Sequence, residues 1–385
     1  MSEYESVISA QPVLVKTKKP RNASFELLRI VAMLFIVSVH FYGFGGWQNV
    51  EGTANVFFMN LTRALFSPSV NIFVLISAYF MCSRDDMKIQ WSKLGKLWLT
   101  VFFYSVLQYA VFTATGVYEF EVNALLKTLF PISLGKYWFV SAYFVMSIAS
   151  PFLNAIIKRL SKAQFSALFI AIVALAALQD AGVMADNFPL NYGYNGIWFC
   201  LLYFLAAYIR KYDINLGTVA WVIGLIVFAG VTLVITFVWH WADYTSIVTV
   251  YMSVFIFLTA KKFSITSKPV SKIICAISPL AFGVYLIHMS PEMCGFMYEN
   301  IFHSSQFIPS KYAYLIYLGF VFATFAACAI AEWMRMLCFK GIDRLAHRLL
   351  GEQIQALKAA WSGFIARIAE RINQKEYPLI DLNNQ

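Results

Sequence analysis

Arg29 and His40 are the two residues of this sequence whose types and spacing most clearly fit a chemical site. They bracket ten residues that are almost wholly apolar, and Glu26 lies three residues before Arg29. Residues eleven positions apart on an α-helix lie within roughly 20° of one face and about 16 Å apart along the axis. An arginine near a helix entrance also serves as an interfacial anchor, and a buried histidine also serves as a packing residue. Because Glu26 can pair with Arg29 on the same face, we interpret this face as functional.

The composition indicates the environment in which these groups act. Of 385 residues, 60% are hydrophobic and 13% are charged, whereas soluble domains contain about 25% charged residues. This composition predicts a polytopic membrane protein. The formal net charge of +10 would also suit nucleic acid, but in a membrane chain it reflects cytoplasmic loops that face anionic lipid. We therefore expect the lipid bilayer as a partner, and no nucleic acid.

The apolar blocks predict an all-α fold with about ten transmembrane helices. The predicted helices cover residues 25–44, 56–82, 91–115, 137–157, 165–178, 194–209, 219–239, 244–260, 273–289 and 312–338. The predicted organisation is a cytoplasmic tail at 1–24, a membrane domain at 25–340 and a second cytoplasmic tail at 341–385. Apolar residues recur at helical spacing from Ile354 to Ile372 in the second tail. They predict an amphipathic helix, either on the inner leaflet or on the protein's own cytoplasmic face.

The basic residues determine the predicted orientation. With both chain ends inside, the cytoplasmic segments contain all but four of the 30 Lys and Arg residues, the exceptions being Arg63, Lys127, Lys136 and Lys311. One missed or extra helix would invert every later loop and remove this asymmetry. A polar segment precedes the first apolar block without a cleavable leader, so we expect the first helix to stay in a multi-pass protein.

Isolated polar residues within the apolar blocks are the remaining candidates for chemistry. Ser67-Pro68-Ser69 interrupts the second block and predicts a broken helix before the span that begins at Val70. Irregular backbone at membrane depth is tolerated where it lines a polar cavity. Glu332 and Arg335 lie three residues apart, and we interpret them as a structural ion pair.

The sequence predicts no metal site. Six cysteines are scattered without a CxxC pair or a Cys/His cluster, and we interpret them as buried apolar residues. There is also no phosphate-binding loop, nucleophile elbow or zinc-protease helix. In the predicted topology His288 lies at a depth close to that of His40. The two histidines therefore either share one cavity or ligate a haem between them.

Several segments that contain the candidate polar residues resemble the acyltransferase-3 family. The members of this family are integral membrane O-acyltransferases that modify bacterial surface glycans. The first predicted span resembles the family's R-x10-H signature, in which ten residues separate Arg29 from His40. Residues 70–80 resemble the family's second-helix motif. Ala78 stands where the family usually has glycine, and its side chain affects how closely another backbone can approach at this position. Three further segments are similar to the family: residues 137–139, 150–153 and 282–288.

The resemblance implies a membrane O-acyltransferase of the bacterial cytoplasmic membrane. Such an enzyme transfers an acyl group, most often acetyl, from cytoplasmic acyl-CoA to a hydroxyl of an extracytoplasmic glycan. Acetyl-CoA is then a co-substrate, and no bound cofactor is implied. His40 and Arg29 are the predicted catalytic residues. The predicted substrate-binding or donor-binding residues are Glu26, Asn71, Ser77, Arg84, Trp138, Tyr285 and His288.

The residue chemistry supports this function independently. A cation near the inner mouth can bind the donor phosphates, and Arg84 lies on the same predicted side with Lys88, Lys93 and Lys96. The imidazole further along the same face suits a general base. It also suits a nucleophile that forms an acyl-histidine, and the sequence leaves both routes open.

The alternative class is a secondary transporter or flippase of a glycan or small molecule. It would share the spans and the embedded charges, but such proteins usually show repeat symmetry between their halves. The second half of the sequence contains no counterpart of the segment from Arg29 to His40.

Overall fold

The computed structural model describes residues 21–84, 88–182, 190–239 and 242–374. The regular structure in these ranges is helical and contains no strand, which confirms the predicted all-α fold. The chain divides into two compact units, residues 1–329 and 330–385, and each is described by itself. Most of the predicted N-terminal tail lies outside the described residues.

The first unit is built from fourteen α-helices and the start of a fifteenth. They are α1 (Ala23–Phe44), α2 (Thr53–Phe66), α3 (Ser69–Met81), α4 (Trp91–Ala114), α5 (Val122–Leu129), α6 (Trp138–Arg159), α7 (Lys162–Asp180), α8 (Gly196–Lys211), α9 (Thr218–Val234), α10 (Ile247–Lys262), α11 (Lys268–Ile277), α12 (Ala281–His288), α13 (Pro291–Phe296), α14 (Ser304–Phe307) and α15 (Ala313–Gln374).

Eight helical segments among the described residues are long and apolar enough to cross a membrane. They correspond to eight of the ten predicted spans. The other two predicted spans are α8 and α10, which contain 16 residues each. Such a helix is about 24 Å long, shorter than a hydrocarbon core of about 30 Å. The count of ten spans and the cytoplasmic position of both chain ends therefore stay predictions.

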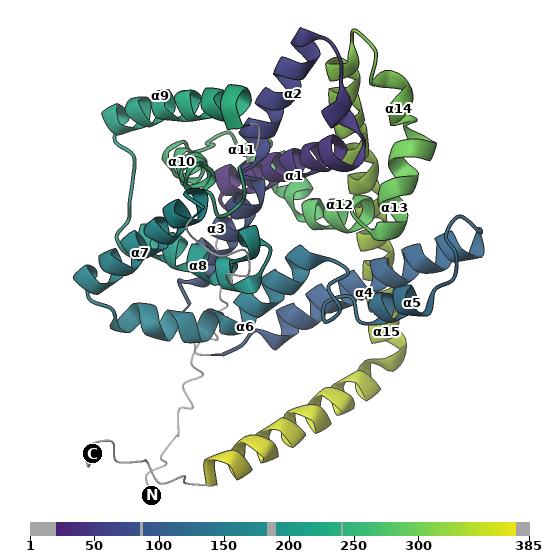
Figure 1. The fold of residues 1–385 in the computed structure, drawn as a ribbon. Coiled ribbons are helices and arrows are strands. Elements are labelled where there is room, and N and C mark those ends of the chain that lie inside the picture. Colours follow the sequence, from purple (N-terminus) through teal and green to yellow (C-terminus); the bar gives the residue numbers. More distant parts are fainter. Residues whose placement is uncertain (1–20, 85–87, 183–189, 240–241, 375–385) are drawn as a thin grey trace, which may run out of the picture. The chain divides into compact units, whose positions relative to one another are not determined.

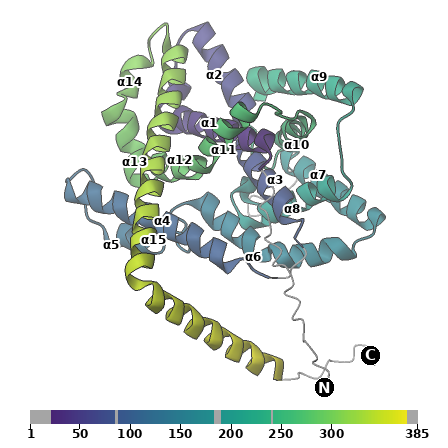
Figure 2. The ribbon, with the colours of Figure 1, turned by 180° about the vertical axis from the view of Figure 1, so that it is seen from behind.

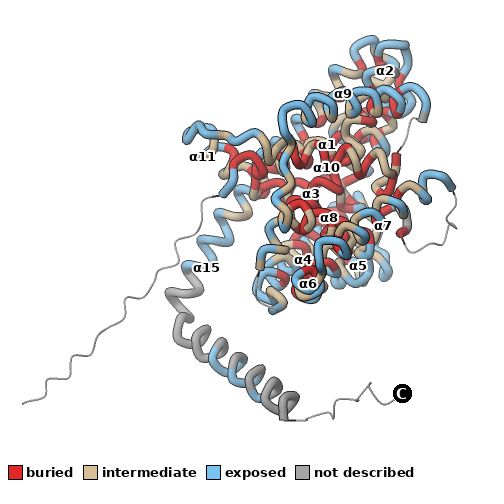
Figure 3. Tube along the Cα trace, turned by 90° about the vertical axis from the view of Figure 1, so that its left-hand side faces the viewer, coloured by how far each residue is buried: buried red, intermediate tan, exposed pale blue. Residues whose placement is uncertain are grey.

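Helix α1 lies at the centre of the first unit (Figures 1 and 2). It contacts α2, α3, α10, α11 and α12, and α3 in turn contacts α8 and α10. Figure 3 shows buried residues concentrated along α1, α3, α8 and α10. Helix α9 instead exposes apolar side chains such as Val219, Ile223 and Ile226. A continuous apolar face of this kind fits contact with lipid.

Two of the spans are broken by a Ser-Pro pair. The break between α2 and α3 lies at Ser67 and Pro68, as the sequence predicts. The span predicted at 273–289 corresponds to the helical segment Lys268–His288, but a 3-10 turn that was not predicted, Ser278–Leu280, separates α11 from α12 within it. Pro279 provides no backbone N–H and its ring crowds the preceding turn, so the regular α-helix ends there.

The second unit contains the continuation of α15, which ends at Gln374. Glu332 and Arg335 form the expected ion pair, in which Arg335 Nε and Nη2 each donate to a carboxylate oxygen at 2.7 Å. The predicted amphipathic segment is helical, and Trp361 and Phe364 are exposed on it. The side chains of Ile354 and Ile372 lie outside the described residues.

Lys136 and Glu292 form a buried ion pair that joins the segment before α6 to α13. The Nζ–Oε1 distance is 2.7 Å and each side chain is 2% exposed. Lys136 Nζ also donates to Thr128 Oγ1 at 3.0 Å. Burial lowers the pKa of the Lys136 ammonium group, and the hydrogen bond and charge of Glu292 oppose that shift. The pair matters for stability because loss of one partner leaves an uncompensated buried charge.

We predict that Lys136→Met destabilises the folded protein by about 3–5 kcal/mol, since the Glu292 carboxylate then stays buried without its cation. The double variant Lys136→Met/Glu292→Leu should recover most of this loss. The measurement is the temperature of unfolding in detergent. Lys261→Met is the matched control, because the carboxylate of its partner Asp213 is 79% exposed and an exposed ion pair contributes little. Equal shifts for the two single variants would contradict the prediction.

Candidate functional site

His40 and His288 meet in the first unit. His40 lies near the end of α1, and His288 is the last residue of α12. His40 Nδ1 lies 2.9 Å from His288 Nε2, within hydrogen-bond distance. The two histidines are therefore in direct contact, although only His40 lines a cavity. A metal bonded to both nitrogens would hold them about 4 Å apart, so the haem alternative does not fit this direct contact.

The hydrogen bonds of His288 determine which nitrogen of His40 remains available. His288 Nδ1 lies 2.6 Å from the carbonyl oxygen of Val284. A carbonyl only accepts, so Nδ1 of His288 carries the proton and its Nε2 accepts when the ring is neutral. His40 Nδ1 must then donate to His288 Nε2. This tautomer leaves a lone pair on His40 Nε2, as a base or a nucleophile requires.

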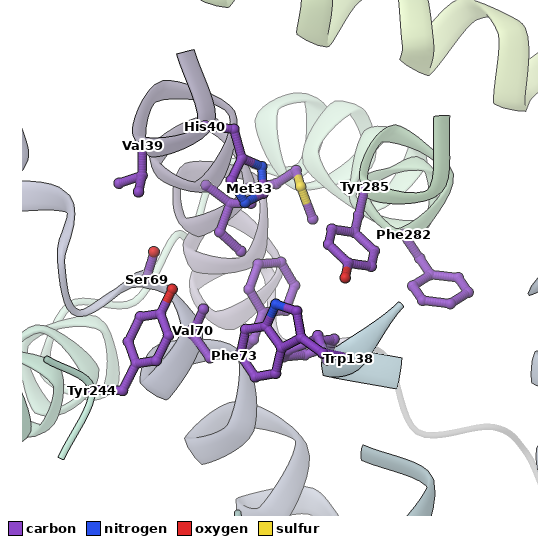
Figure 4. Close-up of a pocket in the computed structure, with 12 residues that line it drawn as sticks. Met33, Val39, His40, Ser69, Val70, Phe73, Trp138, Tyr244, Phe282 and Tyr285 are labelled. Atoms are coloured by element: carbon purple, nitrogen blue, oxygen red, sulfur yellow. The ribbon is translucent and has the colours of Figure 1, made fainter. Parts of the chain in front are cut away.

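His40 lines a small cavity, here called the His40 cavity (Figure 4). Its volume is about 60 Å³. The residues that line it come from α1, α3, α6, α12 and the segment before α10: Met33, Ile36, Val39, His40, Ser69, Val70, Phe73, Trp138, Phe139, Tyr244, Phe282 and Tyr285. The break before α3 places Ser69 and Val70 at this cavity. Two predicted binding residues, Trp138 and Tyr285, lie here with their rings directed into it.

A second cavity, the Arg29 cavity, has a volume of about 270 Å³. Arg29, Glu26 and Ser77 line it, together with Ser278 from the turn between α11 and α12. Arg29 Nη1 donates to Glu26 Oε1 at 2.7 Å. Ser278 Oγ donates to the other carboxylate oxygen of Glu26. Glu26 is therefore held by protein groups at both oxygens, and it orients Arg29 at the cavity wall.

Three phenylalanines, Phe73, Phe139 and Phe282, line both cavities. They come from α3, α6 and α12 respectively. Because the same rings form part of each lining, the Arg29 cavity and the His40 cavity are neighbours across a wall of aromatic side chains. All three lie in segments that resemble the family, but none was predicted as a site residue, since phenylalanine in an apolar span is ordinarily a packing residue.

A third cavity, the Arg84 cavity, adjoins the Arg29 cavity. Its volume is about 220 Å³, and Arg84, Gln90 and Lys93 contribute polar groups to its lining. Leu97 and Tyr143 line both this cavity and the Arg29 cavity. Two of the basic residues that the sequence placed on one side, Arg84 and Lys93, thus line the first of three adjoining cavities, and His40 lines the last.

His288 and Asn71 are both fully buried, and neither lines any of these three cavities. Asn71 is held among protein groups. Its Nδ2 donates to the backbone oxygen of Tyr244 at 2.8 Å. Its Oδ1 accepts from Trp198 Nε1 at 3.1 Å. Asn71 therefore positions the segment that carries Tyr244. The sequence also missed Tyr244 and Ser278, although the pair Ser278-Pro279 repeats the pattern of Ser67-Pro68 and so was a detectable signal of a second break.

Comparison with known proteins identifies the family of the chain. A family model described as an acyltransferase domain, Acyl_transf_3, matches residues 22–333, a range that includes α1, both histidines and every residue that lines the three cavities except Arg21. Comparison with curated proteins and with solved structures finds no match. Since the family model covers most of the chain, the chain belongs to the acyltransferase-3 family and is a membrane acyltransferase.

Proposed function

We propose that this acyltransferase transfers an acetyl group from cytoplasmic acetyl-CoA to a hydroxyl of an extracytoplasmic glycan in the bacterial cytoplasmic membrane. The observation that carries the proposal is the adjacency of the Arg29 and His40 cavities across the three phenylalanines. A cation lies on one side of this wall and an oriented imidazole on the other. The acyl group then has a short path between them.

The donor occupies the Arg84 and Arg29 cavities. Arg84, Lys93 and Arg29 supply the positive charge that the donor phosphates need. The Arg29 cavity is open enough for the thioester arm, which extends toward the phenylalanine wall. The chain ends and the donor both lie on the cytoplasmic side in this proposal.

His40 is the general base. Its Nε2 takes the proton from the acceptor hydroxyl, whose oxygen attacks the thioester carbonyl carbon. The tetrahedral oxyanion collapses, the C–S bond breaks, and the CoA thiolate takes the proton from His40. His288 holds the His40 ring and accepts its Nδ1–H throughout. The N-terminus of α3 borders the cavity at Ser69 and Val70, and the positive end of its dipole favours the oxyanion.

The size of the His40 cavity favours a short acyl group. A cavity of about 150 Å³ accommodates benzene. The His40 cavity, at about 60 Å³, suits two or three carbon atoms and excludes a long chain. Its lining is mostly apolar and offers water few hydrogen-bond partners, which protects the thioester from hydrolysis.

We predict that purified protein in detergent transfers acetyl from acetyl-CoA to methyl pyranosides without any membrane gradient, with at least about tenfold preference over octanoyl-CoA. Mass spectrometry of the O-acylated sugars, with release of free CoA, is the measurement. A transporter would consume no thioester under these conditions. If the reconstituted protein moved a solute across sealed vesicles and never released CoA, the transporter would replace the enzyme.

We predict that His40→Ala abolishes transfer and that His288→Ala lowers kcat by about 10²-fold or more, because the His40 ring loses its orienting acceptor. His288→Gln should restore part of the rate, since its amide oxygen can accept from His40 Nδ1–H. His303→Asn is the control, because His303 is exposed in the loop before α14. A stable acyl adduct on His40, found by acid quench and mass spectrometry, would replace direct transfer with the two-step route.

We predict that Arg29→Lys raises KM for acetyl-CoA about tenfold with a smaller change in kcat, because lysine keeps the charge but loses the planar fork. The steady-state rate is measured against donor concentration. Arg63→Lys serves as the control, since Arg63 is another embedded arginine and bonds to Tyr42 Oη at 3.1 Å. If KM for the donor stayed constant while transfer vanished, Arg29 would act in the chemical step or in folding.

A further inference from the structure

We propose that Trp138, Tyr194 and Tyr244 form an acceptor subsite at the His40 cavity, where the face of a pyranose ring stacks on their aromatic rings. This inference rests on the proposed function and adds to it the place at which the acceptor binds. Tyr194 and Tyr244 were not among the residues that the sequence singled out.

The three rings form one cluster. The ring centroids of Trp138 and Tyr194 are 4.6 Å apart, and those of Tyr194 and Tyr244 are 5.0 Å apart. Trp138 and Tyr244 are stacked at 5.9 Å with an angle of 23° between their planes. The rings come from the start of α6, the segment before α8 and the segment before α10. Three separate parts of the chain thus converge on one aromatic surface.

The cluster connects the solvent-accessible surface to His40. Trp138 and Tyr244 line the His40 cavity and are half-buried (Figure 4). Tyr194, which contacts both of them, is 39% exposed. His288, in contrast, is fully buried. An acceptor that contacts Tyr194 first therefore reaches the cavity by way of Trp138 and Tyr244.

The surroundings of Tyr244 hold the cluster in a fixed position. Asn71 Nδ2 bonds to the backbone oxygen of Tyr244, as described above. Gly193, next to Tyr194, has a φ of +92°, and a Cβ there would lie 2.6 Å from the Cβ of Tyr244. Only glycine permits both this backbone conformation and this close approach. The segment before α8 is therefore pressed directly against the segment before α10.

The chemistry of this cluster differs from that of the phenylalanine wall. Phe73, Phe139 and Phe282 line both the Arg29 cavity and the His40 cavity, and their side chains carry no polar atoms. Trp138, Tyr194 and Tyr244 combine a flat apolar ring with an N–H or O–H at its edge, an arrangement that serves contact surfaces with both apolar and polar parts. A pyranose ring presents C–H groups on its faces and hydroxyls at its edge. The phenylalanine wall thus suits the acyl donor, and the cluster of Trp138, Tyr194 and Tyr244 suits the sugar.

The test compares acyl transfer to methyl glucopyranoside with transfer to sorbitol, an open-chain polyol that has hydroxyls but no ring face. Tyr194→Ala should raise KM for the pyranoside about tenfold and that for sorbitol less than twofold. KM for acetyl-CoA should stay within twofold of that of the wild type. Tyr194→Phe keeps the ring but loses its hydroxyl, and it should raise KM for the pyranoside less than Tyr194→Ala does. Tyr192→Ala is the matched control, because Tyr192 is 40% exposed two residues away and lies outside the cluster.

Two results would overturn the inference while leaving the proposed function intact. One is an equal rise of KM for the pyranoside and for sorbitol in Tyr194→Ala. The other is a rise for the pyranoside in Tyr192→Ala that matches that in Tyr194→Ala. If the wild-type protein released no CoA with any acceptor, the proposed function itself would fail, and the subsite would fail with it. Size-exclusion profiles in detergent identify variants that do not fold, and Tyr194→Phe then provides the reference for a folded protein with the ring retained.

Discussion

The contact between His40 and His288 is the interaction on which the rest of this site depends. A polar group inside an apolar helical bundle must find a hydrogen-bond partner, because desolvation otherwise destabilises it. Each histidine supplies that partner for the other across α1 and α12, and the Val284 carbonyl completes the chain. The requirement for partners thus fixes both ring orientations, and the same bonds leave one nitrogen of His40 with a lone pair. The hydrogen bonds that stabilise the two buried histidines therefore also leave His40 Nε2 available for the proposed proton transfer.

The two helix breaks have a common consequence for the cavities. The break at Ser67 and Pro68 places Ser69 and Val70 at the His40 cavity, and the turn at Ser278–Leu280 places Ser278 at the Arg29 cavity. An unbroken helix would fill these positions with packed side chains and satisfied backbone. Breaking a helix frees N–H and C=O groups, which are tolerable only beside a cavity or another polar group. At the second break, the Oγ of Ser278 is such a polar group, and it bonds to Glu26.

Much of the fold could be predicted from the sequence, whereas the walls of the site could not. Long apolar blocks and helical spacing determine helices almost by themselves, and the pair Arg29 and His40 stands out because both groups are costly in an apolar span. The proximity of His288 to His40 was one of two open alternatives, since periodicity gives depth but not which helices are neighbours. Phe73, Phe139 and Phe282 lie in segments that resemble the family, but nothing in the sequence marked them as residues of the site. Their role depends on where two cavities meet, which is a property of packing between helices far apart in sequence.

The phenylalanine wall solves a problem that any such transferase faces. The donor is proposed to enter from one side and the acceptor from the other, so an open passage between them would admit water to the thioester. Three aromatic rings from α3, α6 and α12 close the passage with side chains that need no hydrogen-bond partner. Rings can turn aside for a small acyl group at the cost of side-chain contacts alone, whereas a wall of hydrogen-bonded polar groups would have to break its bonds. The wall therefore separates the two substrates until the donor arm displaces it.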